Sequence, residues 1–107
     1  PLEQRAHPRV LGPFDGWVVG LLDFPIQLYN LSLGGAFVNS TTSAPIRGKQ
    51  MTLRIELPGQ GEIEVRAEAC FAVPDFGYGV RFLELTDEAS DQLNRTLDAL
   101  TTARNRR

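Results

Sequence analysis

The sequence predicts an all-β fold with one C-terminal helix, in which six strands form a small antiparallel barrel or sandwich. The first observation is size, because 107 residues with 42% hydrophobic content support one core and are too few for two. The second is a series of six short runs with strand character, separated by turn residues. The third is a change to helical periodicity after residue 86. Closure into a barrel would also hide the edges of the sheet.

The first three strands are expected at 16–22, 25–32 and 35–39. The run GWVVGLL is rich in apolar and β-branched residues and ends at Asp23, and PIQLYNLS then resumes the pattern. The third run, GAFVN, follows a pair of glycines. The next stretch, STTSAPIRGK, has the composition of a loop.

The last three strands are expected at 51–57, 62–73 and 78–85. The sequence PGQG between the first two is typical of a hairpin turn, and PDFG separates the second from the third. Because side chains along a strand alternate between its two faces, one face of each strand should enter the core. The residues of these faces are Met51, Leu53, Ile55, Leu57, Ile63, Val65, Ala67, Ala69, Phe71, Tyr78, Val80 and Phe82.

The final segment is expected to be an amphipathic helix over 86–103. Thr86 suits the N-cap position, and acidic residues follow it in the first turn. The apolar side chains should cover an open end of the barrel, mainly through the first two leucines. The apolar positions recur every three or four residues, at Ala89, Leu93, Leu97 and Leu100.

These elements divide the chain into four parts. The residues before the strands have few apolar side chains to anchor them and should be mobile. The chain begins with Pro1 rather than Met, which suggests a processed start or a piece of a longer polypeptide. The expected parts are a flexible N-terminal arm at 1–12, a β-barrel at 13–85, a helix at 86–103 and a basic tail at 104–107.

The composition restricts the possible functions. With 11 basic and 13 acidic residues, the net charge of −2 argues against a broad basic surface for long nucleic acids, whereas a partner with two or three negative charges fits. The single Cys70 cannot form an internal disulfide or a thiolate metal cluster, and the single His7 gives little support to a metal site. No apolar stretch approaches the ~18 residues of a membrane span. The sequence therefore predicts a cytoplasmic protein without a metal or cofactor.

Two arginines, Arg5 and Arg9, lie four residues apart before the first strand. Because His7 precedes Pro8, the segment should be extended rather than helical. In an extended chain the two arginines point the same way, with Cα atoms up to about 13 Å apart. Guanidinium groups bind phosphate oxygens or the guanine edge and stack on bases. The pair is therefore either a clamp for a small anionic ligand or ordinary solvated surface.

A second polar cluster lies in NLSLGG, residues 30–35. Asn30 and Ser32 are two residues apart, so they should share the exposed face of their strand. An amide suits a base edge, and a hydroxyl can donate to a phosphate oxygen. Gly34 and Gly35 would let a ligand approach the backbone, although a glycine pair between strands is also typical of a turn or bulge.

Together these two motifs resemble those of the PilZ family, which are RxxxR in a loop before the barrel and (D/N)xSxxG early in it. Here they read RAHPR at 5–9 and NLSLGG at 30–35, in the same order. The ending GYGVRFLEL, followed by a helix, is also similar to the family, so the resemblance covers essentially the whole chain. It implies a six-stranded antiparallel β-barrel of the split-barrel type and a receptor for the bacterial second messenger cyclic di-GMP.

The resemblance also implies a role for each motif residue. Arg5 and Arg9 would contact phosphate and guanine and stack on the bases. Asn30 would recognise a guanine edge, and Ser32 would hydrogen-bond at or near the phosphate. Gly35 would keep the backbone open for the ligand.

Three neighbouring positions complete the candidate site. Gln4 stands where the family often has a further arginine, which removes one cation and favours one ligand per domain. His7 and Gly34 lie inside or beside the motifs and are further candidates for ligand contact. Ligand binding would order the arm and change contacts with an adjacent domain or a protein partner, in the control of a process such as motility or biofilm formation.

Other functions are less well supported by the sequence. A PilZ-like adaptor that binds a protein and no nucleotide is the main alternative, although both motifs are present. An enzyme is not expected, because the glutamates at 56, 62, 64 and 68 occupy the polar faces of strands. A general DNA- or RNA-binding barrel is not expected either, since Arg54, Arg66 and Arg81 are interspersed with glutamates.

Overall fold

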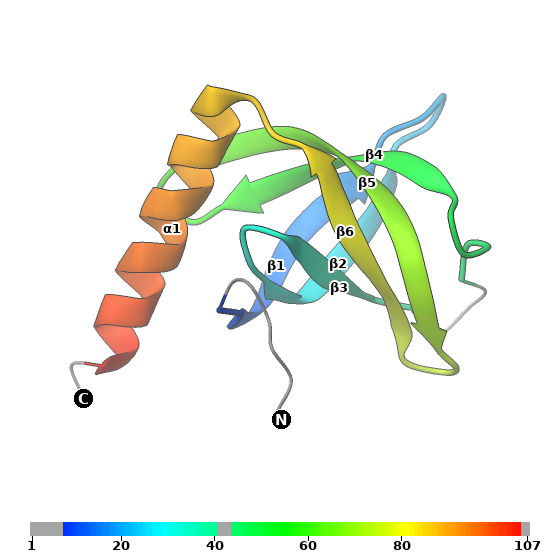
Figure 1. The fold of residues 1–107 in the computed structure, drawn as a ribbon, viewed down its shortest axis with the longest axis horizontal. Coiled ribbons are helices and arrows are strands. Elements are labelled where there is room, and N and C mark those ends of the chain that lie inside the picture. The colour runs from blue at the N-terminus through cyan, green and yellow to red at the C-terminus, as the bar shows by residue number, and fades with distance from the viewer. Residues whose placement is uncertain (1–7, 41–43, 106–107) are drawn as a thin grey trace.

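Six antiparallel strands close into one barrel, and a single helix follows them (Figure 1). This computed structural model describes residues 8–40 and 44–105. The elements are β1 (Val10–Val18), β2 (Phe24–Leu31), β3 (Gly35–Asn39), β4 (Gln50–Leu57), β5 (Gly61–Val73), β6 (Gly77–Glu84) and α1 (Asp87–Asn105). Around the barrel the strands follow the order β1-β2-β3-β6-β5-β4. The predicted six-stranded barrel with a C-terminal helix is confirmed, and the sandwich alternative is excluded.

The first strand lies earlier than predicted. It was expected at 16–22, but β1 is Val10–Val18, and residues 20–22 form the bend before β2. Leu21 and Leu22 are exposed in that bend, so their apolar character does not mark a strand. The barrel therefore begins inside the segment assigned to the arm at 1–12, rather than at residue 13.

A bulge explains why the start of β1 was missed. The pairing of β1 with β2 shifts register between Leu11 and Phe14, and this shift accommodates Gly12 and Pro13. Glycine and proline in a sequence argue against a regular strand, but both are tolerated at bulges. Long-range pairing with β2 therefore overrides the local signal.

The seam that closes the barrel, between β1 and β4, is short. Within the described chain, β1 pairs with β4 at Gly16, Trp17 and Val18, and just beyond them the N–H of Val19 donates to the carbonyl of Thr52 at 2.9 Å. By contrast, β4 pairs with β5 over the whole of Gln50–Leu57. The sheet is thus much more tightly joined through β4 and β5 than across the seam.

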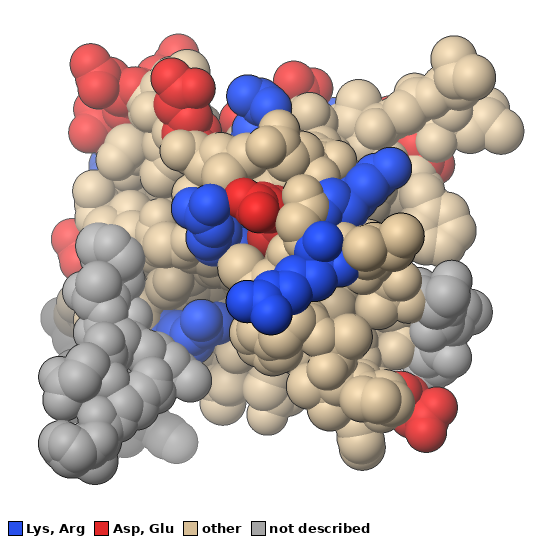
Figure 2. Space-filling view, turned by 45° about the vertical axis from the view of Figure 1, so that its right-hand side comes forward, with Lys and Arg blue, Asp and Glu red and all other residues tan. Residues whose placement is uncertain are grey.

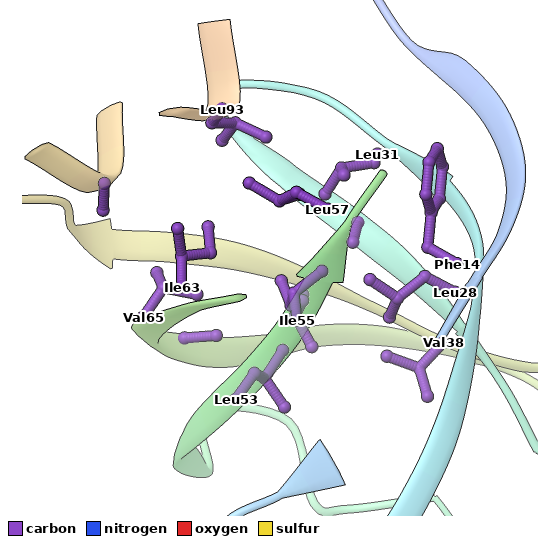
Figure 3. Packing of buried hydrophobic residues seen from close by; sticks show 14 of the residues in the cluster. Phe14, Leu28, Leu31, Val38, Leu53, Ile55, Leu57, Ile63, Val65 and Leu93 are labelled. Carbon is purple, nitrogen blue, oxygen red and sulfur yellow. The ribbon is translucent and has the colours of Figure 1, made fainter. Parts of the chain in front are cut away.

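Alternate residues of the strands fill the barrel, as Figure 3 shows. Burying one Leu, Ile or Val side chain stabilises a fold by about 1.5–3 kcal/mol, so this cluster supplies much of the driving force for folding. The prediction is confirmed for the inner face of β4 and most of that of β5. The buried residues of these two strands are Leu53, Ile55, Leu57, Ile63, Val65, Ala67 and Ala69.

Phe71 was predicted to lie in the core, but its side chain is 53% exposed. The ladder between β5 and β6 shifts register between Ala69 and Phe71, and this bulge reverses the alternation of faces. The ring of Phe71 covers Gly79 of β6, where an added Cβ would lie 2.3 Å from a ring carbon. The glycine therefore provides the space that an aromatic ring occupies on the outer face.

The helix α1 is capped and packed as the sequence predicts. The backbone N–H of Ala89 donates to Thr86 Oγ1 at 3.0 Å, which is an N-cap hydrogen bond. Leu93 enters the same cluster as Leu31 and Leu57 (Figure 3). The helix continues to Asn105, two residues beyond the predicted end at 103 and into the segment assigned to the basic tail. In the part of the chain that the structure describes, no helix has the length and hydropathy needed to cross a membrane.

Candidate functional site

Arg9 and Asn30, which come from the two separate sequence motifs, meet in the structure. Arg9 directly precedes β1, and the β1–β2 ladder places Leu11 opposite Asn30. The Arg9 side chain thereby reaches the end of β2, where its Nη1 donates to Asn30 Oδ1 at 2.8 Å. Both residues are partly buried. The hydrogen bond orients the guanidinium and the amide with respect to each other at the surface of the barrel.

The other three candidates around the first motif, Gln4, Arg5 and His7, lie outside the described residues. Their participation in the site therefore stays a prediction from the sequence.

Ser32 was predicted to be exposed beside Asn30, and this is wrong. Its relative exposure is 3%, and its hydroxyl is bonded within the turn between β2 and β3. The hydroxyl accepts from the N–H of Gly34 at 3.1 Å and of Gly35 at 3.2 Å, and it donates to the carbonyl of Gly35 at 3.3 Å. A buried hydroxyl with three partners fixes the shape of a turn. Ser32 therefore holds the backbone of the glycine pair in place.

Gly35 is required by the packing of the strands themselves. It lies opposite Arg81 in the β3–β6 ladder. An added Cβ would lie 2.2 Å from the carbonyl oxygen of Val80 and 3.1 Å from the Cα of Arg81. Both atoms belong to the backbone, which cannot move aside as a flexible side chain could. The sequence correctly indicated a need for glycine, but the need arises from the close approach of β6 and does not require a ligand.

Arg81 is a basic residue that the sequence did not assign to this site. Residues directly opposite in an antiparallel pair project on the same side of the sheet, so Arg81 lies beside Gly35 on the outer face. Its side chain is 60% exposed, and Nη2 lies 2.8 Å from Oε1 of Glu68 on β5. Only the register of β3 with β6 reveals this proximity, since 46 positions of sequence separate the two residues.

Aromatic side chains continue the same outer face away from Asn30. Phe37 of β3 is the ladder partner of both Asn30 and Gly79. Its ring contacts Tyr29 edge to face, with centroids 6.4 Å apart, and Phe71 at 6.1 Å. Tyr29 and Phe71 are both exposed. Aromatic rings in this position offer flat apolar surface against which a base or another ring can stack.

Positive charge is unevenly distributed over the protein. Figure 2 shows a face on which several Lys and Arg side chains lie close together around a small acidic group, while other Asp and Glu side chains in view lie towards the edges. The whole chain has a net charge of −2. The clustering therefore creates a locally positive surface on a weakly acidic protein, which favours anionic ligands at short range.

The chain is a small β-barrel domain with a helix packed on it. Its candidate site is the Arg9–Asn30 pair, next to the glycine turn that Ser32 holds in place. A family model described as PilZ domain matches residues 3–99. The chain belongs to the PilZ domain family, and the resemblance noted from the two sequence motifs is confirmed. A search of curated protein sequences gives no match.

Several solved structures share the fold. The PilZ domain of YcgR from Escherichia coli with c-di-GMP has a TM-score of 0.78 at 17% identity, and the match covers 97% of this chain and 96% of that one. YcgR from Escherichia coli in complex with c-di-GMP gives 0.82 at 18% identity, covering 98% of this chain and 49% of that one. The Bacillus subtilis inhibitor of motility MotI/DgrA gives 0.79 at 18% identity, covering 99% and 53%. The chain thus spans about half the length of the last two proteins.

Proposed function

We propose that this domain is a receptor for cyclic di-GMP, bound on the outer face of the barrel next to the β2–β3 turn. The observation that carries the proposal is the 2.8 Å hydrogen bond between Arg9 and Asn30, because it joins residues of the two PilZ motifs into one site. Membership of the PilZ family and the c-di-GMP complexes of the two YcgR structures support the same ligand.

The chemistry of the site suits a cyclic dinucleotide. The ligand carries two phosphates and two guanine bases, so it needs cations, base-edge partners and stacking surface together. Arg9, with Arg5 from the preceding segment, supplies guanidinium groups for phosphate and guanine. Asn30 supplies an amide for a guanine edge, and Tyr29 and Phe37 supply aromatic surface beside it.

Ser32 and the glycine pair have a supporting role in this proposal. Ser32 accepts hydrogen bonds from the backbone N–H groups of Gly34 and Gly35, which sets the conformation of the turn. The turn then forms a fixed edge of the site between Asn30 and Arg81. Ser32 acts through this geometry, and direct contact between its hydroxyl and a phosphate is not needed.

Arg81 is a further candidate for ligand contact, because it flanks Gly35 on the side away from β2. We expect Arg81→Ala to weaken cyclic di-GMP binding about three- to tenfold, since the exposed Arg81 guanidinium must exchange its ion pair with Glu68 for a phosphate and so gains only a modest charge-assisted contact. Calorimetric titration at two salt concentrations checks this, and the variant should show a weaker salt dependence than the wild type.

Arg66→Ala is the matched control for Arg81. It removes the same charge from an exposed residue of the neighbouring strand β5, where Arg66 donates to Gln50. If both variants weaken cyclic di-GMP binding equally, then Arg81 contributes only to the general positive potential of the surface. A loss confined to the Arg81 variant supports a direct contact.

The residues before β1 supply the output in this proposal. Bound ligand attracts Arg5 to the barrel and orders the segment that ends at Arg9, which changes how an adjacent domain or protein partner meets this domain. Fixing eight or so residues costs about 1 kcal/mol or more each, so charge-assisted contacts must supply much of the affinity. MotI/DgrA of Bacillus subtilis is an inhibitor of motility, which makes motility one process that such a switch would control.

Calorimetry with cyclic di-GMP tests the function and the stoichiometry together. We expect saturable binding of one ligand per domain and no comparable binding of GMP, which lacks the second base and phosphate. Absence of binding by the intact wild-type chain would reject the receptor proposal and favour the adaptor alternative. Two ligands per domain would reject the single-ligand expectation based on Gln4.

A further inference from the structure

A second candidate surface lies at the other ends of the strands that form the ligand site. It is a cleft of about 980 Å³ bounded by the last part of β1, the start of β2, the end of β3 and the turn between β5 and β6. β2 runs from Phe24 in this cleft to Asn30 in the ligand site, a span of six residues or about 20 Å at the rise of a strand. Both turns next to the cleft lie on the side of the barrel away from α1 (Figure 1).

The mouth of the cleft carries large apolar side chains in contact with solvent. Phe24 and Phe76 line it and are 63% and 68% exposed. Leu21 and Leu22 are exposed on the adjoining β1–β2 turn. Single exposed apolar residues are ordinary, but two large ones that line one cleft, with two more on the adjoining turn, are typical of an interaction surface.

The charged residues of the cleft all have the same sign. Among the described residues that line it, Asp15, Glu56 and Asp75 are acidic, and none is Lys or Arg. Tyr78 also lines the cleft, and desolvation by burial raises its pKa, so the phenol stays neutral. The fixed charge around the apolar mouth is therefore negative.

The nearby cation Arg54 does not change this balance. It lies over the ring of Trp17, 5.5 Å from the ring centroid, and forms an ion pair with Asp23 at 2.5 Å. Its charge is thus matched by a carboxylate that is not part of the cleft lining. Asp15 of the lining accepts a hydrogen bond from the neutral amide of Gln27 at 3.1 Å, and none of the three acidic residues forms an ion pair with another described residue, so their negative charge is not neutralised.

We propose that this cleft, defined by Phe24, Phe76 and its acidic rim, docks a segment of a partner protein that inserts an apolar side chain flanked by Lys or Arg. Charge complementarity favours this occupant over a second copy of the same surface. In a symmetric dimer through the cleft, each acidic rim would face the other, and like charges in contact oppose association. The ligand site lies at the opposite ends of β2 and β3, so the partner and cyclic di-GMP can be bound at the same time.

Site-specific photocrosslinking in the native host cell tests this proposal with the full chain. Phe76 is replaced by p-benzoylphenylalanine, and the control carries the same group in place of Thr101, an exposed residue of α1. We expect an adduct from position 76 only, and mass spectrometry of the crosslinked peptide should identify an apolar residue next to Lys or Arg.

Reversing the charge of one acidic rim residue provides a second test, which is read from the yield of the same adduct. Glu56→Lys should lower the yield of this adduct about fivefold or more, because it replaces attraction by repulsion at the rim. Asp98→Lys makes the same change of net charge on exposed α1 and should leave the yield unchanged. If Glu56→Lys lowers the melting temperature of the domain, Asp15→Lys is used instead as the charge-reversal variant of the rim.

Four outcomes would overturn the proposal. These outcomes are no adduct, an adduct peptide without basic residues, crosslinks only between copies of this chain, or equal effects of the two charge reversals. Calorimetry with cyclic di-GMP is independent of all of them, so failure here leaves the receptor function standing.

Discussion

Replacing Arg9 with alanine is expected to lower the affinity for cyclic di-GMP at least tenfold, which corresponds to about 1.4 kcal/mol of binding free energy. The substitution removes a guanidinium that the Asn30 amide orients through a 2.8 Å hydrogen bond. In the proposed site, the variant would lose both a charge-assisted contact to phosphate and the orientation of Asn30 towards a guanine edge. Calorimetric titration of the variant and the wild type gives the ratio of dissociation constants.

Two further variants make the result specific. Arg95→Ala removes the same charge from an exposed residue of α1, where Arg95 bonds to Gln60, and should bind like the wild type. Arg9→Lys keeps the charge but loses the planar fork, so its affinity should fall between those of wild type and Arg9→Ala. We expect Arg5→Ala to behave like Arg9→Ala. Near-unchanged isotherms for both alanine variants, with unchanged melting temperatures, would refute the assigned site.

Replacing Gly35 with alanine is expected to destabilise the barrel by about 2–4 kcal/mol even without ligand, because overpacking against backbone forces strands apart. The new Cβ would lie 2.2 Å from the Val80 carbonyl oxygen. The β3–β6 ladder would have to separate locally, and its hydrogen bonds would lengthen. Urea unfolding, followed by the fluorescence of Trp17, measures the change.

Gly20→Ala is the control for this effect. At Gly20 the nearest atom to an added Cβ is 3.6 Å away, which is ordinary van der Waals contact. The free energy of unfolding of the Gly20→Ala variant should therefore stay within about 0.5 kcal/mol of the wild-type value. If Gly35→Ala instead keeps full stability and loses only ligand binding, then this glycine serves ligand access, as the sequence alone suggests.

Much of the fold follows from local signals. The alternation over 51–57 and the helical spacing after Thr86 predict β4 and α1 because each element buries one face. The errors in the strands all involve bulges or turns. Gly12 and Pro13 lie at the register shift that concealed the start of β1, and a similar shift turns Phe71 outward. Such shifts depend on a partner strand and have no periodic signal of their own.

The candidate site was likewise predictable only in part from the sequence. Arg9 and Asn30 were identified because their residue types and spacing suit an anionic nucleotide, and the structure brings them together. Ser32 was assigned to the exposed face because a strand alternates, but the chain turns at this residue and buries the hydroxyl. Arg81 could not be assigned, since only the strand order places β6 next to β3.

The short seam between β1 and β4 has a consequence for the motions of the domain. A barrel opens most easily where few backbone pairs hold it, and this seam is held by Gly16, Trp17 and Val18 and by the Val19 hydrogen bond to Thr52. This seam lies at the end of β1 away from Arg9, whereas the start of β1 is held by β2 through the pairs of Val10 with Leu31 and of Leu11 with Asn30. The hydrogen bond from Arg9 to Asn30 adds a side-chain link at this held end, so local opening of the barrel at the seam should leave the two motif residues together.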